Sequence, residues 1–416
     1  MGAFSIFSNK KKHKDTGALP EPELNYYEAV GRRLNKLKYV VLFLLIIFLV
    51  GGFTFFSDQL SIENFRYMLK FMSIDMDSEI PDGAVIEYDA SPGTKALVVS
   101  GDLAVCDSNG VQIFDMTGER FLRDRDFMND PMCAVSGHNL LVCDRGSNKL
   151  NAYTVYTRVY THNADYPIYD LCSSAGSGRY AILTAAKGYR SGIEVYDAEF
   201  RKIFDYYFAD RYLSGVAISR DGKSAAACAV NNTQRGDFMA ELYVFDVNDA
   251  NKYEVYKLQD EIPWKAVFRE DGGLLLLTNS ALRLYGKSGE EARIDYGGEA
   301  IKGFCLTGGV CALAFETAGL SNGTTVRFYD GTFGALGSAD YSGDVSRIDV
   351  LDGIAYVCAA GELYTVDVRT GKELGAETVG GSYVGMIKDP GSGKRIMIFE
   401  GKAEFRSADG AGNGES

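Results

Sequence analysis

The stretch GVQIFDMTGE, residues 110–119, combines an apolar strand with a tight turn, and the chain repeats this pattern. Successive copies lie about 40 residues apart, which is the period of β-propeller blades that contain several short strands each. The repeat therefore predicts an all-β fold. Its clear copies are GIEVYDAEFR (192–201), ELYVFDVNDA (241–250), TVRFYDGTFG (325–334) and ELYTVDVRTG (362–371), and its weaker copies are KLNAYTVYTR (149–158), ALRLYGKSGE (281–290) and GKAEFRSADG (401–410).

A second series of segments, each a Gly-containing turn followed by an apolar strand, supports the same count. The strands read as apolar runs because radially stacked sheets bury both of their faces. Together the two series predict an eight-bladed β-propeller over residues 84–407, with seven blades as the alternative. The second series is SGDLAVC (100–106), SGHNLLVC (136–143), AGSGRYAIL (175–183), RDGKSAAAC (220–228), EDGGLLLL (270–277), TGGVCALAF (307–315), DGIAYVC (352–358) and GSGKRIMIF (391–399).

The two ends of the repeat region complement each other. The last repeat ends without an outer strand, whereas AVIEYDA (84–90) is a strand without a sheet of its own. Pairing 84–90 with 403–407 would close the ring and remove its open edge. We therefore expect the N-terminal strand to be the outermost strand of the last blade.

A repeated aspartate ends the clear copies of the strand. In the first copy, Asp115 is placed to accept hydrogen bonds from the following turn, where Gly118 supplies a positive φ. Carboxylates at repeated positions also resemble a catalytic or metal-binding ladder, but turn stabilisation is the simpler interpretation. The equivalent residues are Asp197, Asp246, Asp330 and Asp367.

The N-terminal region predicts a membrane anchor. Residues 39–57 contain no charged side chain, and as a helix they would extend roughly 28 Å, close to the hydrocarbon thickness of a bilayer. A cleaved signal peptide is the alternative, but no A-x-A-like site follows. Basic residues crowd the N-terminal flank, so the positive-inside rule predicts a cytoplasmic tail at 1–38 and an extracytoplasmic body. Residues 58–83 read as a juxtamembrane amphipathic helix and linker, and 408–416 as a flexible tail.

Charge is unevenly distributed along the chain. The formal net charge is −13, although residues 1–38 hold eight basic against four acidic residues. The body is therefore acidic, and phosphate-rich polymers would be repelled by it. The sequence predicts no nucleic-acid partner.

The eight cysteines do not form a metal-binding or disulfide pattern. No CxxC motif occurs, and most of the cysteines fall at equivalent points of successive repeats. We interpret them as small buried hydrophobic residues. The pairs that could form disulfides are Cys305 with Cys311 and Cys133 with Cys143, because each pair flanks a predicted hairpin turn.

Residues 84–407 resemble the WD, YVTN and quinoprotein-like propeller superfamily. The segment SRDGKSAAACAV (219–230) is similar to the DG-K turn and apolar strand of that superfamily, and the FD, YD and VD dipeptides stand where WD repeats carry Trp-Asp. With its basic tail and single apolar span, the layout resembles an uncharacterised family of membrane-anchored propellers of Gram-positive bacteria. The chain departs from the quinoprotein pattern, because Trp264 is its only tryptophan. The resemblance brings no activity with it.

Catalytic, cofactor-binding and metal-binding motifs are not found. Only His138 and His162 follow the predicted span, too few for a histidine-based triad or metal site. The GKS at 222–224 lacks the first Gly of a P-loop, because residue 217 is alanine. We predict a non-enzymatic protein without catalytic residues, cofactor or metal.

The rim of the channel is the candidate binding surface. Loops between second and third strands and links between blades share one rim in propellers. Aromatic and arginine side chains there would offer contact area and donors to a partner, with packing between blades as the alternative role. The candidate partner-binding residues are Phe127, Tyr166, Tyr169, Arg190, Tyr212, Arg235, Trp264 and Tyr383.

These observations predict a single-pass protein of the cell membrane with an extracytoplasmic propeller. The favoured function is a scaffold or sensor that binds a protein or a cell-envelope component. The alternative is a hydrolase acting on glycan or peptidoglycan, which would need two carboxylates roughly 5–10 Å apart at the channel rim.

Overall fold

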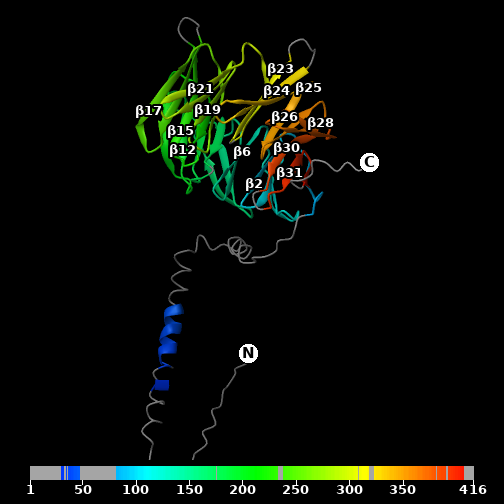
Figure 1. Cartoon of the computed structure of the whole chain (residues 1–416). Coiled ribbons are helices and arrows are strands. Elements are labelled where there is room, and N and C mark those ends of the chain that lie inside the picture. Colours follow the sequence, from blue (N-terminus) through cyan, green and yellow to red (C-terminus); the bar gives the residue numbers. More distant parts are fainter. Residues whose placement is uncertain are drawn as a thin grey trace, which may run out of the picture. The chain divides into compact units, whose positions relative to one another are not determined.

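The strands form eight four-stranded antiparallel sheets, which are arranged as blades around an axis (Figure 1). We number the blades 1 to 8 in the order of their inner strands along the chain. The prediction of eight blades is confirmed, and the seven-blade alternative is wrong. The computed structural model describes residues 30–31, 34, 36–46, 81–174, 176–232, 238–307, 309–317, 323–380, 382–389 and 392–406.

Each blade has an inner, a second, a third and an outer strand. The inner strands of blades 1 to 8 are β2 (Lys95–Val99), β6 (Pro131–Ser136), β10 (Asp170–Ser173), β14 (Tyr212–Ile218), β18 (Pro263–Phe268), β22 (Ile301–Thr307), β26 (Val345–Leu351) and β30 (Tyr383–Lys388). The second strands are β3 (Asp102–Asp107), β7 (Asn139–Asp144), β11 (Tyr180–Ala186), β15 (Ser224–Asn232), β19 (Leu274–Thr278), β23 (Val310–Glu316), β27 (Ile354–Ala359) and β31 (Arg395–Phe399).

The third strands are still largely buried, as in β4 (Gly110–Phe114), whereas the outer strands carry many exposed residues, as in β29 (Glu373–Thr378). The third strands are β4 (Gly110–Phe114), β8 (Lys149–Tyr153), β12 (Tyr189–Tyr196), β16 (Phe238–Asp246), β20 (Ala281–Gly286), β24 (Gly323–Asp330), β28 (Glu362–Asp367) and β32 (Lys402–Arg406). The outer strands are β5 (Arg120–Asp124), β9 (Arg158–Asn163), β13 (Lys202–Phe208), β17 (Asp249–Leu258), β21 (Gly289–Asp295), β25 (Ala335–Ser342), β29 (Glu373–Thr378) and β1 (Val85–Glu87).

The hydrophobic core lies between neighbouring blades. Between blades 3 and 4, for example, Val195 and Phe204 belong to the same buried cluster as Val216 and Ala227. All five residues of β4 and of β19 are buried. The apolar runs in the sequence are thus explained, because each sheet buries both faces against adjacent sheets.

Blade 8 closes the ring with strands from both ends of the propeller. Strand β1 pairs antiparallel with β32, with Ile86 opposite Ala403. The Tyr88 hydroxyl reinforces the seam, because it donates hydrogen bonds to the carbonyls of Phe399 (2.5 Å) and Lys402 (2.8 Å). The predicted closure is therefore confirmed.

The repeated aspartates stabilise turns, as predicted. The Asp367 carboxylate accepts hydrogen bonds from the backbone amides of Arg369 (3.0 Å) and Thr370 (2.9 Å). These hydrogen bonds, with the Thr370 backbone bond as the largest contribution, hold the pKa of Asp367 below its ordinary value. The other four aspartates also accept backbone hydrogen bonds from the following turn: Asp115, Asp197, Asp246 and Asp330.

None of the eight cysteines forms a disulfide. The predicted candidate pairs are therefore not disulfides, and the two thiols that contact each other are Cys106 and Cys133, on adjacent blades. Burial raises the pKa of Cys228 to about 12, which makes that thiol unreactive. The interpretation as small core residues holds for the five buried cysteines: Cys106, Cys143, Cys228, Cys311 and Cys358.

The chain divides into two compact units, residues 1–76 and 77–416. In the first unit the structure describes a helix through residues 36–46. Among the helical residues that are described, no stretch has both the length and the apolar character that a membrane crossing requires. Most of the tail at 1–38, the part of the predicted span after residue 46, the juxtamembrane segment up to residue 80 and the tail at 407–416 lie outside the described residues.

Candidate functional site: a cavity in the propeller channel

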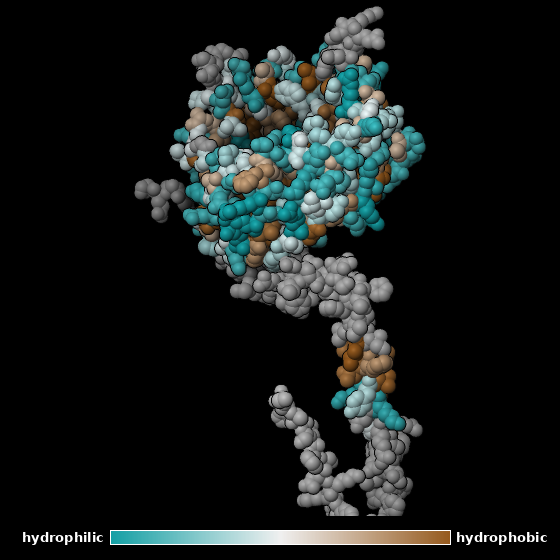
Figure 2. Space-filling model, turned by 180° about the vertical axis from the view of Figure 1, so that it is seen from behind, coloured by the Kyte–Doolittle hydropathy of each residue, from teal (hydrophilic) through white to brown (hydrophobic). Residues whose placement is uncertain are grey.

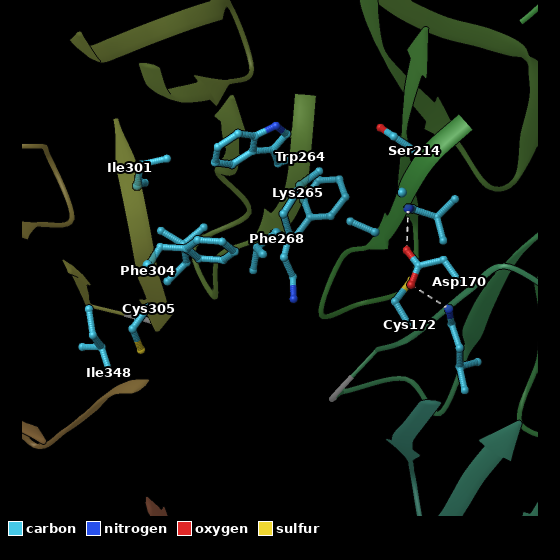
Figure 3. A pocket seen from close by; sticks show the side chains of 18 of the residues that line it. Asp170, Cys172, Ser214, Trp264, Lys265, Phe268, Ile301, Phe304, Cys305 and Ile348 are labelled. Carbon is cyan, nitrogen blue, oxygen red and sulfur yellow. Dashed lines mark hydrogen bonds between the residues drawn. The ribbon is translucent and has the colours of Figure 1, made fainter. Parts of the chain in front are cut away.

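A cavity with a volume of about 930 Å³ lies in the central channel of the propeller. Its walls are the inner strands of five consecutive blades, β10, β14, β18, β22 and β26, joined by Arg145 from the turn after β7. Side chains from these strands converge on it in Figure 3. Figure 2 shows hydrophobic atoms gathered in the hollow at the upper end of the propeller, whereas its outer surface is mostly hydrophilic. We call this space the channel cavity.

A β-bulge near the start of the inner strands decides which side chains face the channel. The strand register shifts around Ser214, Trp264, Lys302 and Ser346 in blades 4 to 7. A bulge leaves one residue unpaired and re-aims its side chain. Two of the bulged residues are serines that bond to nearby carbonyls, Ser214 to Pro263 (3.1 Å) and Ser346 to Cys358 (3.2 Å). The same backbone position in blades 5 and 6 carries a tryptophan and a lysine.

Three aromatic rings form the apolar wall of the channel cavity: Trp264, Phe268 and Phe304. Trp264 is 44% exposed and Phe304 is 37% exposed, although both belong to inner strands. Within the described part of the chain, none of the three rings stacks on another ring. Large exposed aromatic surface inside a concave site is typical of ligand-binding pockets.

The two carboxylates that line the cavity fasten neighbouring blades together. Asp170 of β10 accepts a hydrogen bond from the backbone amide of Val216 on β14 (3.1 Å). In the same way, Asp349 of β26 accepts one from the amide of Met386 on β30 (2.9 Å). The neighbouring Gly385 permits this approach, because a Cβ there would lie 3.1 Å from the Asp349 Oδ2. Both acids therefore have structural hydrogen bonds to backbone groups of the next blade.

The environment of Asp170 also affects its ionisation. Burial raises the pKa of Asp170 above its ordinary value, while the backbone hydrogen bonds from Val216 and Leu171 oppose that rise. The Asp349 carboxylate has a charged neighbour, because its Oδ1 accepts a hydrogen bond from the Arg347 guanidinium at 2.7 Å.

The cavity does not present the carboxylate pair that a glycoside hydrolase needs. Its two acids, Asp170 and Asp349, belong to blades 3 and 7, which are opposite each other in a ring of eight. A retaining or inverting mechanism requires acids on the two sides of one bond, separated by roughly 5–10 Å. Among the described residues, no group of three His, Cys, Asp or Glu side chains is placed to hold a metal.

Ion pairs compensate charged residues in the links before four of the blades. Four blades pair a residue of the preceding link with a residue of the third strand. In blade 5, Glu261 of the link is 4% exposed and accepts hydrogen bonds from Arg283 Nε (3.0 Å) and Nη2 (2.5 Å). In blade 4 the charges are exchanged, because Arg211 is in the link and Glu241 on the strand (2.7 Å). The remaining pairs are Asp126 with Lys149 in blade 2 and Glu299 with Arg327 in blade 6.

Of the predicted partner-binding residues, Trp264 lines the channel cavity. The Tyr383 hydroxyl lies 3.5 Å from the cavity residue Asp349, but its ring packs against Phe399, with 6.0 Å between centroids. Burial raises the pKa of Tyr383 above its ordinary value, and a partner-binding role for this residue stays a prediction.

The other predicted residues do not line the cavity. The Arg190 guanidinium lies over the ring of Tyr212, 5.0 Å from its centroid. Phe127 is 77% exposed in the link before blade 2. Tyr169 is exposed and Tyr166 is half-buried, both in the link before blade 3. Arg235 lies outside the described residues.

Sequence reasoning missed most of the cavity wall, including Lys265, Phe268 and Phe304. A signal was present, because the inner strands can be placed just before the Gly-containing turns. In EIPWKAVFREDGG (261–273), for example, the segment before the turn is the inner strand of blade 5. The bulge at Trp264 interrupts the alternation of side chains, so the pattern alone did not show which residues face the channel.

Comparisons with known proteins agree with this architecture. Residues 83–405 match a protein family described as "Family of unknown function (DUF5711)". No curated protein sequence matches the chain. Among solved structures, BamB from Moraxella catarrhalis superposes with a TM-score of 0.53 at 10% identity, covering 80% of this chain and 99% of BamB.

A second similar structure is Chaetomium thermophilum Sqt1 bound to the N-terminus of the ribosomal protein L10. It superposes with a TM-score of 0.50 at 10% identity, covering 78% of this chain and 96% of the Sqt1 chain. At this level of identity, both likenesses show the fold alone.

Proposed function

The chain belongs to the DUF5711 family of unknown function, and from this premise we propose that it is a non-enzymatic scaffold or sensor. Its propeller binds a segment of a partner protein in the channel cavity. The observation that carries this proposal is the exposure of Trp264 and Phe304 inside a cavity of about 930 Å³. Exposed aromatic residues in a pocket are the anchors that dominate protein recognition.

The pairing of nearby charges supports the same assignment. Charged side chains of the links are engaged with third strands, as in Glu261 with Arg283. The cavity acids, Asp170 and Asp349, are engaged with backbone amides. The exposed rings of the aromatic wall therefore remain available for contact with a ligand.

The Sqt1 structure supports the proposed mode of binding. In that structure a propeller is bound to the N-terminus of a ribosomal protein. A chain terminus is narrow enough to enter a channel, and the present cavity lies in the channel of its propeller. We therefore propose a terminus or an extended loop as the bound segment.

We also propose that the propeller is extracytoplasmic and tethered by residues 39–57. Support comes from the 19 uncharged residues of this segment and from the basic residues before it. Protease treatment of intact cells tests the orientation. We expect digestion of the propeller and protection of an N-terminal epitope, and an intact propeller on cells with a digestible cytosolic control would contradict it.

Site-specific photocrosslinking in cells tests partner binding. A photoreactive phenylalanine replaces Phe304 in the cavity, and a matched variant replaces Tyr253, which is 42% exposed on the outer strand β17. We expect a discrete adduct from position 304 that is absent from position 253. Addition of Trp264→Ala is expected to reduce this adduct at least about thirtyfold, because loss of an aromatic anchor costs about 2 kcal/mol or more.

The same experiment identifies the class of the partner. A protein adduct that depends on Trp264 supports the proposal. Equal adducts from positions 304 and 253, or an adduct with a cell-envelope glycan in place of a protein, would contradict it.

A further inference from the structure

The channel cavity is basic, although the chain as a whole is acidic. The net charge of the chain is −13. The cavity lining nevertheless contains four cationic side chains against two acidic ones, namely Arg145, Lys265, Lys302 and Arg347 against Asp170 and Asp349. A concave site with charge of one sign concentrates the field and attracts ligands of opposite charge.

Three of the four cations have a carboxylate partner. Arg347 donates to Asp349 at 2.7 Å. Arg145 Nε donates to Asp130 at 2.7 Å. The Lys302 ammonium lies 3.7 Å from the Glu316 carboxylate. These three charges are therefore at least partly compensated by the protein.

Lys265 is different. Its side chain is exposed to the cavity, and among the described residues no carboxylate forms an ion pair with it. Its electrostatic attraction to Asp170 acts over a longer distance and only opposes the rise that burial causes in the pKa of that acid. Figure 3 shows Lys265 extending into the open space between the labelled Phe304 on one side and Asp170 on the other. The cavity thus contains one uncompensated ammonium group beside an aromatic wall.

The strand edges around the cavity complement a peptide backbone. The five inner strands that form the wall are all end strands of their sheets. An end strand has one edge whose backbone N–H and C=O groups are not used in the sheet. Peptides bind to such edges through main-chain hydrogen bonds and place alternate side chains in pockets. Mixed backbone donors and acceptors match a peptide better than they match a uniform polyanion.

We infer that the channel cavity selects an acidic peptide segment with an apolar residue next to a carboxylate. This inference rests on the proposed function and specifies the chemistry of the partner. The Lys265 ammonium pairs with the carboxylate of the segment. Trp264, Phe268 and Phe304 contact the adjacent apolar side chain.

Fluorescence polarisation with labelled octapeptides tests the inference on the full-length chain, purified in detergent with empty micelles as the blank. The probes are alternating glutamate and phenylalanine, alternating lysine and phenylalanine, and alternating glutamate and serine. We expect the first peptide to bind about tenfold more tightly than either of the others, because each loses one of the two complementary contacts.

A charge reversal supplies the decisive comparison. Lys265→Glu is expected to reverse the preference, so that the lysine peptide binds more tightly than the glutamate peptide. Lys257→Glu makes the same change on the exposed outer strand β17 and is expected to leave the preference unchanged. If Lys265→Glu does not fold, Lys265→Gln is expected to abolish the preference between the two charged peptides.

Three results would overturn the inference: an unchanged preference in the folded Lys265 variant, equal binding of the serine peptide, or displacement of the acidic peptide by anionic lipid vesicles. The proposed function is tested separately by the crosslink from position 304. A Trp264-dependent protein adduct whose crosslinked segment lacks carboxylates would refute the acidic ligand and leave the proposed function intact. The lack of any such adduct would refute the proposed function itself.

Discussion

The turns after the third strands and the inner strands both recur around the ring, but they differ in whether the side chain repeats together with the backbone. In the turns, one residue type performs one task, as when Asp330 and Asp367 each accept hydrogen bonds from the next backbone amides. In the inner strands the backbone repeats a bulge, whereas the bulged residue changes from Ser214 to Trp264 to Lys302. Repeated side chains therefore maintain the blades, whereas unrepeated side chains on a repeated backbone line the cavity to which we assign partner binding.

The ion pairs between links and third strands are an intermediate case in how strictly they repeat. Their position is repeated, but the order of the charges is not, since Arg211 and Glu241 exchange the arrangement seen in Glu261 and Arg283. In blades 4 and 5 burial explains the constraint, because Glu241 and Glu261 are nearly inaccessible and an unpaired buried charge is costly whichever sign it has. The common feature of this position is therefore a pair of opposite charges, in either order.

The largest expected effect tests this buried pair. Glu261→Gln leaves Arg283, which is 10% exposed, without its main carboxylate partner. We expect the free energy of unfolding to fall by about 3 kcal/mol, because removal of one partner of a buried pair is strongly destabilising and Glu290 compensates the charge of Arg283 only in part. Urea unfolding of the full-length chain measures the change, with Glu270→Gln on an exposed turn as the control. A loss below about 1 kcal/mol would mean that the pair is effectively solvated.

The next effect is the exchange of a charge pair. Arg211→Glu and Glu241→Arg are each expected to lower the free energy of unfolding by about 2 kcal/mol, because each places two like charges close together. The double variant is expected to recover at least about 1 kcal/mol of the summed loss, as coupling between neighbours allows. Additive losses in the double-mutant cycle would show that the position requires a fixed order of charges.

The repeated positions were those that the amino-acid sequence revealed. The Asp turns and the Gly-containing turns fixed the number of blades, and the unpaired segment at 84–90 predicted the closure with β32. The turns depend on local chemistry that recurs many times, and the segment at 84–90 was recognised because it lacks the rest of a repeat. Periodicity averages over the copies, so no single departure obscures it.

The wall of the channel cavity was only partly identified from the sequence, for the opposite reason. Trp264 was identified by its residue type, but Lys265 and Phe304 occur once and have no repeated counterpart. Their side chains reach the cavity because a bulge shifts the strand by one residue, and such a shift exchanges the two faces of a strand. Tyr383 is not among the residues that line the cavity, and its ring packs against Phe399.

A smaller effect, with a defined pH dependence, is expected for the repeated aspartates. Hydrogen bonds from Thr370 lower the pKa of Asp367, so its ionised form stabilises the folded state above the ordinary carboxylate pKa of 3.8. That stabilisation is lost as the pH falls through the lowered pKa. Asp367→Asn is expected to lower the Tm by about 1–2 °C at pH 7, with a smaller difference at pH 2.5. A difference that persists at pH 2.5 would indicate lost packing in place of lost charge.

The smallest expected effect is at Lys265. Its ammonium has no ion-pair partner in the described part of the chain, and its side chain is exposed. Lys265→Gln is therefore expected to change the free energy of unfolding by less than about 0.5 kcal/mol, as is usual for exposed positions without such partners. Lys257→Gln on β17 is the matched control, and urea unfolding measures both. If Lys265→Gln were as destabilising as Glu261→Gln, Lys265 would be a residue that maintains the blades. The proposed distinction between repeated structural side chains and unrepeated cavity side chains would then be wrong for the residue on which the inferred ligand chemistry depends.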